Sequence, residues 1–169
     1  SEIIVTSKPK HAVEFWLVFR AKHSSRLTHL ISTEPRLREE GREPEIALAI
    51  RKEPEPLGES EGLLYAYLPT GESSKIPGHI NANFFPQSDR KALIFSSRGH
   101  EGKWNQALLD AAAELLASKL ETLIDEIGFV STWKLIYSAF EVRRDQRYFV
   151  FWRHIATAVE KGAELAVNT

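Results

Sequence analysis

The stretch EGLLYAYLPTGESSKIPGHINANFFPQSDRKALIFSSRGHEGKWNQALLDAAAELL, at residues 61–116, determines the fold that we expect for this chain. Apolar runs at 62–68 and 79–85 have the length and composition of strands. A polar turn of sequence SDRK follows at 88–91, and beyond it apolar residues recur at helical spacing. The stretch therefore predicts two strands that lead into a cationic turn, with a long helix behind them.

The run HINANFF at 79–85 shows which kind of sheet to expect. Ile80 and Ala82 fall on one face of the strand, and the intervening residues on the other face are polar. Such alternation indicates a sheet with one packed face and one polar face. The runs at 45–52 and 62–68 are more evenly apolar, which is expected of strands near the centre of a sheet.

Upstream of this stretch, the sequence predicts further strands and one charged loop. A short strand followed by a turn is expected at 1–10, and an aromatic-rich strand at 11–20. Residues 26–31 fit either a further strand or a single helical turn. The segment PRLREEGREP at 35–44 is so highly charged that we expect a solvated loop.

Downstream, the apolar period changes to that of helices. Three helices are expected: residues 105–127 with Gly128 as the stop, residues 133–140 capped by Ser131 or Thr132, and residues 147–165 capped by Asp145.

Strands followed by helices predict an α+β fold, a two-layer sandwich of a mixed sheet with long helices on one face. We expect about four to six strands in that sheet. Residues 1–128 would form the α/β domain, and 129–169 a C-terminal helical extension packed on the same domain.

Composition narrows the classes of function. The 169 residues carry a net charge of −1, which argues against a dedicated nucleic-acid binder or a binder of membrane surfaces. The absence of cysteine excludes disulfides, thiolate metal sites and cysteine nucleophiles. No apolar run reaches the roughly 18 residues of a membrane span. The chain contains no methionine, even at position 1, and so we expect it to be a fragment of a longer protein.

No self-sufficient catalytic constellation is evident. The six histidines lack the four-residue spacing of a helical metal pair, and no phosphate-binding glycine loop or nucleophile elbow occurs. What remains is a cationic cluster of Arg90 and Lys91, with Arg98 and Lys103 further along. An arginine in such a turn presents a planar fork of donors to phosphate or carboxylate, and the alternative is an ordinary surface arginine.

Four strings of the opening stretch carry a family resemblance: GLLYAYLPT, IPGHINANFFP, SDRKAL and WNQALL. Their order and spacing resemble the segment that follows the ATP-binding domain in sacsin-type ATPases. They are also similar to the middle domain of the ninety-kilodalton heat-shock chaperones. There too, two strands, a Ser-Arg turn and a long helix follow one another.

This resemblance implies that residues 1–128 are the middle, transducer-like domain of a GHKL ATPase. In that family a preceding domain binds ATP, and the arginine of the turn contacts the γ-phosphate. Carried over, that arginine is Arg90, with Lys91 in support and Leu93 as the buried anchor of the turn. ATP and Mg²⁺ would belong to the parent protein, a cytoplasmic ATPase. The fragment would hold no cofactor and no metal, and would be inactive by itself.

The role of Arg90 stays open between catalysis, nucleotide sensing and structural docking, the last through an ion pair with Asp89. Its partner would be the N-terminal ATP-binding domain of the same parent chain. A nucleic-acid or membrane partner is not expected.

The rival hypothesis is a non-catalytic module that docks a protein client or a second, homodimeric subunit. Aromatic residues would form its docking face, and exposure of Phe151 or Trp152 would favour this hypothesis. The aromatic residues considered are Phe15, Trp16, Phe19, Tyr148, Phe149, Phe151 and Trp152.

Overall fold

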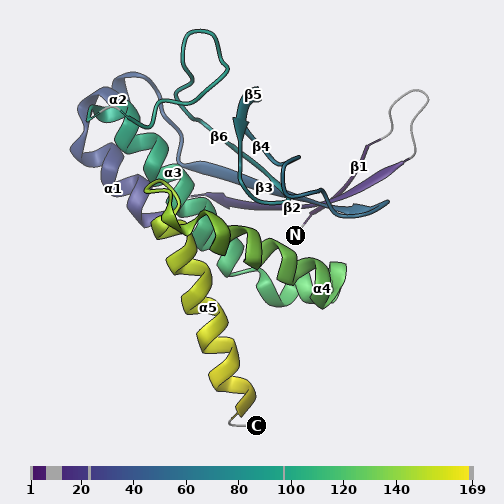
Figure 1. Cartoon of the computed structure of the whole chain (residues 1–169). Helices are drawn as coiled ribbons and strands as arrows, with labels where there is room; N and C mark the ends of the chain where they lie inside the picture. Colours follow the sequence, from purple (N-terminus) through teal and green to yellow (C-terminus); the bar gives the residue numbers. More distant parts are fainter. Residues whose placement is uncertain (1, 7–12, 23, 97, 168–169) are drawn as a thin grey trace.

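The computed structural model of this chain shows an α+β fold, as the order of strands and helices predicted (Figure 1). A mixed sheet holds the N-terminal part of the chain, and the long helices follow it in sequence. The structure describes residues 2–6, 13–22, 24–96 and 98–167.

The sheet has six strands in the order β1-β2-β3-β6-β4-β5. All neighbours are antiparallel except β4 and β6, which run parallel. Alternate residues of β3 are buried, so one face of the sheet packs on the core. The strands are β1 (Glu2–Thr6), β2 (Glu14–Lys22), β3 (Glu45–Glu53), β4 (Leu63–Ala66), β5 (Leu68–Ser73) and β6 (His79–Ala82).

The prediction of a single strand at 62–68, followed by a loop, was wrong. The structure holds two antiparallel strands there, β4 and β5. The reversal occurs at Tyr67, whose φ of 62° is in the left-handed region. Asn81 stabilises this reversal, because its Oδ1 accepts a hydrogen bond from the Tyr67 N–H at 3.2 Å. As predicted, β3 lies at the centre of the sheet, whereas β4 lies beside the edge strand.

Two short helices connect β2 to β3. Helix α1 (Ser25–Thr33) confirms the helical alternative for this segment, although it is longer than one turn. Helix α2 (Pro35–Glu39) occupies the first half of the predicted charged loop. Proline is favourable at the first position of a helix, and Leu37 supplies an apolar anchor that is fully buried.

The three C-terminal helices differ from the predicted ones in their boundaries. The expected helix at 105–127 is split in two, because α3 (His100–Ala117) ends before α4 (Leu120–Glu141) begins. Within α4, Gly128 has φ 80° and ψ 161°, so the helix is interrupted at the residue predicted as a stop. After it the chain becomes helical at once, and Thr132 therefore lies inside the helix rather than at its cap.

A 3₁₀ turn, η1 (Val142–Arg144), leads to α5 (Phe149–Val167). Helix α5 starts two residues later than the sequence predicted, and it projects away from the sheet (yellow in Figure 1). No helix in the described part of the chain combines the length and the apolar composition that crossing a bilayer requires.

One hydrophobic core joins the sheet to the helices on both sides of Gly128. Helix α3 covers β2 and β3, and α4 and α5 pack in turn against the same core. Its fully buried side chains include Phe19, Ile50, Trp104, Leu123, Leu135, Phe151 and Ile155.

Candidate functional site

The predicted cationic turn exists and contains Arg90. Its backbone closes a reverse turn, since the Arg90 N–H donates to the carbonyl of Gln87 at 2.9 Å. Pro86 and Leu93 then pair as an isolated antiparallel bridge, so the segment forms a narrow loop. Leu93 is 4% exposed, which confirms it as the buried anchor. We call residues 86–93 the Arg90 loop.

Arg90 itself has an uncommon backbone conformation. Its φ of 57° lies in the left-handed region, which costs a side-chain-bearing residue about 1–2 kcal/mol. Residues held in this way concentrate at functional sites, where the surrounding structure imposes the conformation. The loop therefore fixes Arg90 at some cost in stability.

The guanidinium of Arg90 is held at the end of β4 and is otherwise exposed. Nη2 donates to the carbonyl oxygen of Ala66 at 3.1 Å, which uses one of five N–H donors. The ion pair with Asp89, which was one of the alternatives for Arg90, is not the arrangement found. The Asp89 carboxylate instead accepts from the backbone N–H of Lys91 at 3.0 Å. The remaining N–H groups of Arg90 are thus presented to solvent or to a partner.

The other candidate cations lie in different surroundings. Lys91 and Arg98 are exposed. Lys103, on α3, pairs with Glu34 at 2.9 Å, and this contact holds the pKa of Glu34 below its usual value. Arg90 and Lys91 consequently remain as the cationic pair of the loop.

Two adjacent residues of α3 fasten the Arg90 loop to the body of the molecule. Trp104 donates its indole N–H to the carbonyl of Asn83 at 2.8 Å. Asn105 is fully buried and hydrogen-bonds the backbone at both ends of the loop, at Phe85 and Ile94. Sequence reasoning did not assign this role, although a buried asparagine beside a tryptophan in an apolar helix was a usable signal.

Strand β5 supports the other side of the loop. The Gly71 N–H donates to the carbonyl of Arg90 at 3.3 Å. A Cβ at Gly71 would lie 2.6 Å from the carbonyl oxygen of Lys91, so only glycine permits this approach. Glu72 adds a side-chain contact, because its Oε2 accepts from the Leu93 N–H at 3.4 Å.

The polar face of the sheet carries a cluster of rings. His79 stacks on Trp16 with ring centroids 5.2 Å apart, and it meets the edge of Tyr65 at the same distance. Its Nδ1 accepts from the Leu63 N–H at 3.1 Å. Burial, helped by the charge of Arg51, lowers the pKa of His79. This face therefore holds a neutral histidine near pH 7.

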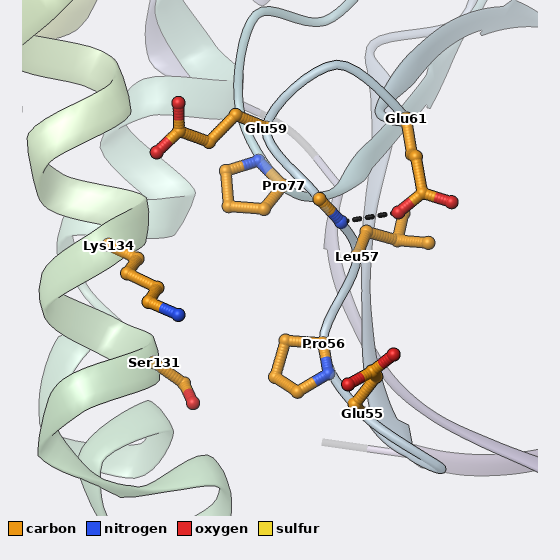
Figure 2. Close-up of a pocket in the computed structure, with 9 residues that line it drawn as sticks. Glu55, Pro56, Leu57, Glu59, Glu61, Pro77, Ser131 and Lys134 are labelled. Atoms are coloured by element: carbon orange, nitrogen blue, oxygen red, sulfur yellow. Dashed lines mark hydrogen bonds between the residues drawn. The ribbon is translucent and has the colours of Figure 1, made fainter.

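A cleft of about 390 Å³ lies between the loop that leads into β4 and helix α4 (Figure 2). Ser131 and Lys134 face this loop from α4. Three carboxylates, of Glu55, Glu59 and Glu61, also line the cleft, so it is unfavourable for an anion such as a nucleotide phosphate. Within the described ranges, no three His, Asp or Glu side chains are grouped as a metal site.

An apolar surface runs along α4, which we call the α4 aromatic surface and define as Phe129, Trp133 and Tyr137. These side chains are 65%, 49% and 45% exposed, and the first two are stacked. The predicted docking aromatics have mixed positions. Phe19, Tyr148 and Phe151 are buried, Phe149 is exposed, and Phe15, Trp16 and Trp152 are half-buried.

Comparisons with known proteins gave no match to any family model, curated protein or solved structure.

Proposed function

We propose that this chain is the middle, transducer-like domain of a sacsin- or chaperone-like GHKL ATPase. It would couple ATP binding in a preceding domain of the same parent chain to a conformational change. The observation that carries the proposal is the Arg90 loop, which holds an exposed guanidinium in a strained turn and is fastened from both sides.

The chemistry of this arrangement suits a γ-phosphate. A guanidinium offers several donors in one plane, and Ala66 occupies only one of them. A cation that meets the charge developing on a transferred phosphoryl group lowers the barrier, and such arginines are worth about 10³-fold or more in rate. The γ-phosphate is lost on hydrolysis, so the same contact distinguishes the two nucleotide states.

The remaining components belong to the parent protein, for which we propose a cytoplasmic location. ATP and Mg²⁺ would bind the preceding domain, and Lys91 would support Arg90 as a second positive charge. The domain alone would neither bind nor hydrolyse ATP.

The test is the ATPase rate of the protein that contains this chain. Arg90→Ala should lower turnover by about 10³-fold, and Arg90→Lys should recover only part of it, because the planar fork is lost. Arg98→Ala is the matched control, being an exposed arginine outside the Arg90 loop, and should leave turnover unchanged. Full activity of Arg90→Ala would remove Arg90 from the mechanism.

A second candidate function is the docking of a protein client or a second subunit, favoured by the α4 aromatic surface. Large apolar side chains grouped on a surface usually mark an interaction site. Replacing Phe129 and Trp133 by serine should reduce self-association or client binding in sedimentation velocity, with little change in unfolding. Equal sedimentation of both proteins, alone and with the client, would count against this function.

A further inference from the structure

Three consecutive residues of β5 connect the Arg90 loop to the start of α5. Gly71 donates its N–H to the carbonyl of Arg90. The carbonyl of Ser73 accepts from the hydroxyl of Tyr148 at 3.3 Å, one residue before α5. Tyr148 is 1% exposed, so this end of the connection is anchored in the core. Strand β5 therefore contacts both the Arg90 loop and the residue that precedes α5.

Glu72, between these two residues, makes the most direct link. One oxygen of its carboxylate contacts the Arg90 loop, and the other contacts Arg147 in the segment before α5. Oε2 accepts from the Leu93 N–H of the loop, and Oε1 accepts from Nη1 of Arg147 at 2.9 Å. The Glu72 side chain is 16% exposed, so water competes weakly for these contacts.

Arg147 is in turn fixed on the side of α5. Its guanidinium also pairs with Asp145 at 2.8 Å, and its carbonyl accepts from the side chain of Gln106 at 2.8 Å. The two carboxylates raise the pKa of Arg147, so it stays charged at every physiological pH. A displacement of Glu72 would consequently pull on a residue that is hydrogen-bonded to α3 and lies two residues before α5.

Strand β5 lies at the edge of the sheet. Among the described strands it pairs with β4 alone, and that pairing is irregular between Leu63 and Tyr65. A cleft of about 460 Å³ separates part of the loop from the segment before α5. Its lining includes Gln87, Phe95, Ser96 and Gln146. The Arg90 loop and the segment before α5 thus face each other across this cleft, which Glu72, Leu93 and Arg147 also line.

We propose that Glu72 is a positioning residue that transmits displacement of the Arg90 loop, through β5, to the N-terminal end of α5. That a nucleotide displaces the loop by contacting Arg90 rests on the proposed function. The connection from the loop to α5 does not depend on that function. Helix α5 projects from the body, so a small shift at its first turn moves its far end by more (Figure 1).

The test is a double-mutant cycle read by hydrogen exchange of the α5 amides from Trp152 onward, on the full chain; the Trp152 N–H donates to the Tyr148 carbonyl at 2.9 Å. Arg90→Ala removes the hydrogen bond to the Ala66 carbonyl and keeps the unfavourable backbone conformation, so it loosens the loop and should speed that exchange by at least about threefold. In a Glu72→Gln background the effect should vanish, because Leu93 and Arg147 use different oxygens of Glu72 and the amide replaces one of these oxygens by an NH2 donor. Global stability is measured by urea unfolding in each variant, so that only local opening is compared.

Asp145→Asn is the matched control. It weakens a partner of Arg147 that is as close as Glu72, and in the described part of the chain no hydrogen bond joins the Asp145 side chain to the loop. In this background Arg90→Ala should still speed exchange in α5. An equal effect in the Glu72→Gln and Asp145→Asn backgrounds, or no effect in the unmodified chain, would overturn the proposal.

The two proposals fail in different ways. If Arg90→Ala leaves ATPase turnover of the parent unchanged while the exchange cycle shows coupling, the nucleotide role is wrong and the link stands. If turnover falls but exchange in α5 does not respond to the loop, the link is wrong and the nucleotide role stands.

Discussion

The side-chain amide of Asn105 forms two hydrogen bonds with the backbone of a single residue, Phe85. Asn105 Oδ1 accepts from the Phe85 N–H at 2.7 Å, and Nδ2 donates to the Phe85 carbonyl at 2.8 Å. The second Nδ2 proton reaches the carbonyl of Ile94 at 2.9 Å. One buried side chain thus adds to the direct hydrogen bond from the Ile94 N–H to the Phe85 carbonyl and holds the two sides of the Arg90 loop together.

Asn105→Leu should therefore destabilise the protein strongly. It takes this partner from the Phe85 N–H and the Ile94 carbonyl and leaves the Phe85 carbonyl with only the Ile94 N–H, so we expect a loss of about 3 kcal/mol in the free energy of unfolding. Urea unfolding followed by circular dichroism measures it. Gln87→Ala, which removes an exposed amide on the loop, is the control and should change stability by less than about 0.5 kcal/mol. A similar small change for Asn105→Leu would contradict this role.

Arg90 and Lys91 should respond in opposite ways to glycine and alanine. At Arg90 the left-handed backbone favours glycine, so Arg90→Gly should be more stable than Arg90→Ala by about 1 kcal/mol. Lys91 has no such conformation, so Lys91→Gly should be less stable than Lys91→Ala by about 0.5–1 kcal/mol. Thermal unfolding of the four variants measures both orders. The same order at both positions would mean that the turn is not strained at Arg90.

Gly71 should not tolerate a methyl group. A Cβ there meets the backbone oxygen of Lys91 at 2.6 Å, and so Gly71→Ala must displace either β5 or the Arg90 loop, at a cost of about 1–3 kcal/mol. Gly162→Ala is the control. Gly162 lies in α5 with no atom within 4 Å of the added carbon, so this change should stabilise by about 0.5–1 kcal/mol. Chemical unfolding of the two variants distinguishes the steric contact at Gly71 from the general preference of helices for alanine over glycine. No change in stability for Gly71→Ala would show that β5 does not approach the Lys91 carbonyl closely.

His79 should make stability depend on pH. Its pKa is lowered in the folded state, chiefly by burial, whereas the unfolded chain binds a proton near pH 6.5. Below pH 6.5 the unfolded chain binds a proton that the folded protein does not bind. The free energy of unfolding therefore falls as the pH drops through 6.5 towards the folded-state pKa, and it rises again as the pH is raised.

The measurement is urea unfolding at about pH 5 and about pH 7.5. His79→Phe keeps the ring on Trp16 and should flatten the difference between the two stabilities. His29→Gln, at an exposed histidine, should keep the difference. An unchanged difference in His79→Phe would assign the dependence to other groups.

The fold class was predictable because apolar residues alternate in the N-terminal part of this chain, as in strands, and recur every three or four residues in the C-terminal part, as in helices. The break at Gly128 was predictable for a similar reason, since glycine is a local signal. The end of α3 was not. Apolar residues such as Leu120 and Leu123 continue the helical spacing beyond it, and only packing decides where one helix ends and the next begins.

The candidate site was predictable only in part. Arg90 was a candidate from the sequence of the turn itself, and the burial of Leu93 was expected from the family resemblance. The contacts of Asn105 and Glu72 join residues about 20 positions apart, which no local pattern reports. The reversal at Tyr67 was missed because a tyrosine with a positive φ gives no turn signal, and its partner Asn81 lies in another strand.

The position of β6 constrains how the sheet is assembled during synthesis. β6 lies between β3 and β4, so β3 has no neighbour on that side until residues 79–82 are available. Without these residues, β1-β2-β3 and β4-β5 would be two separate sheets, each with an unpaired edge. The four residues of β6 join them, so the sheet can become continuous only once β6 has been made, and it can do so before α3, α4 and α5 are made.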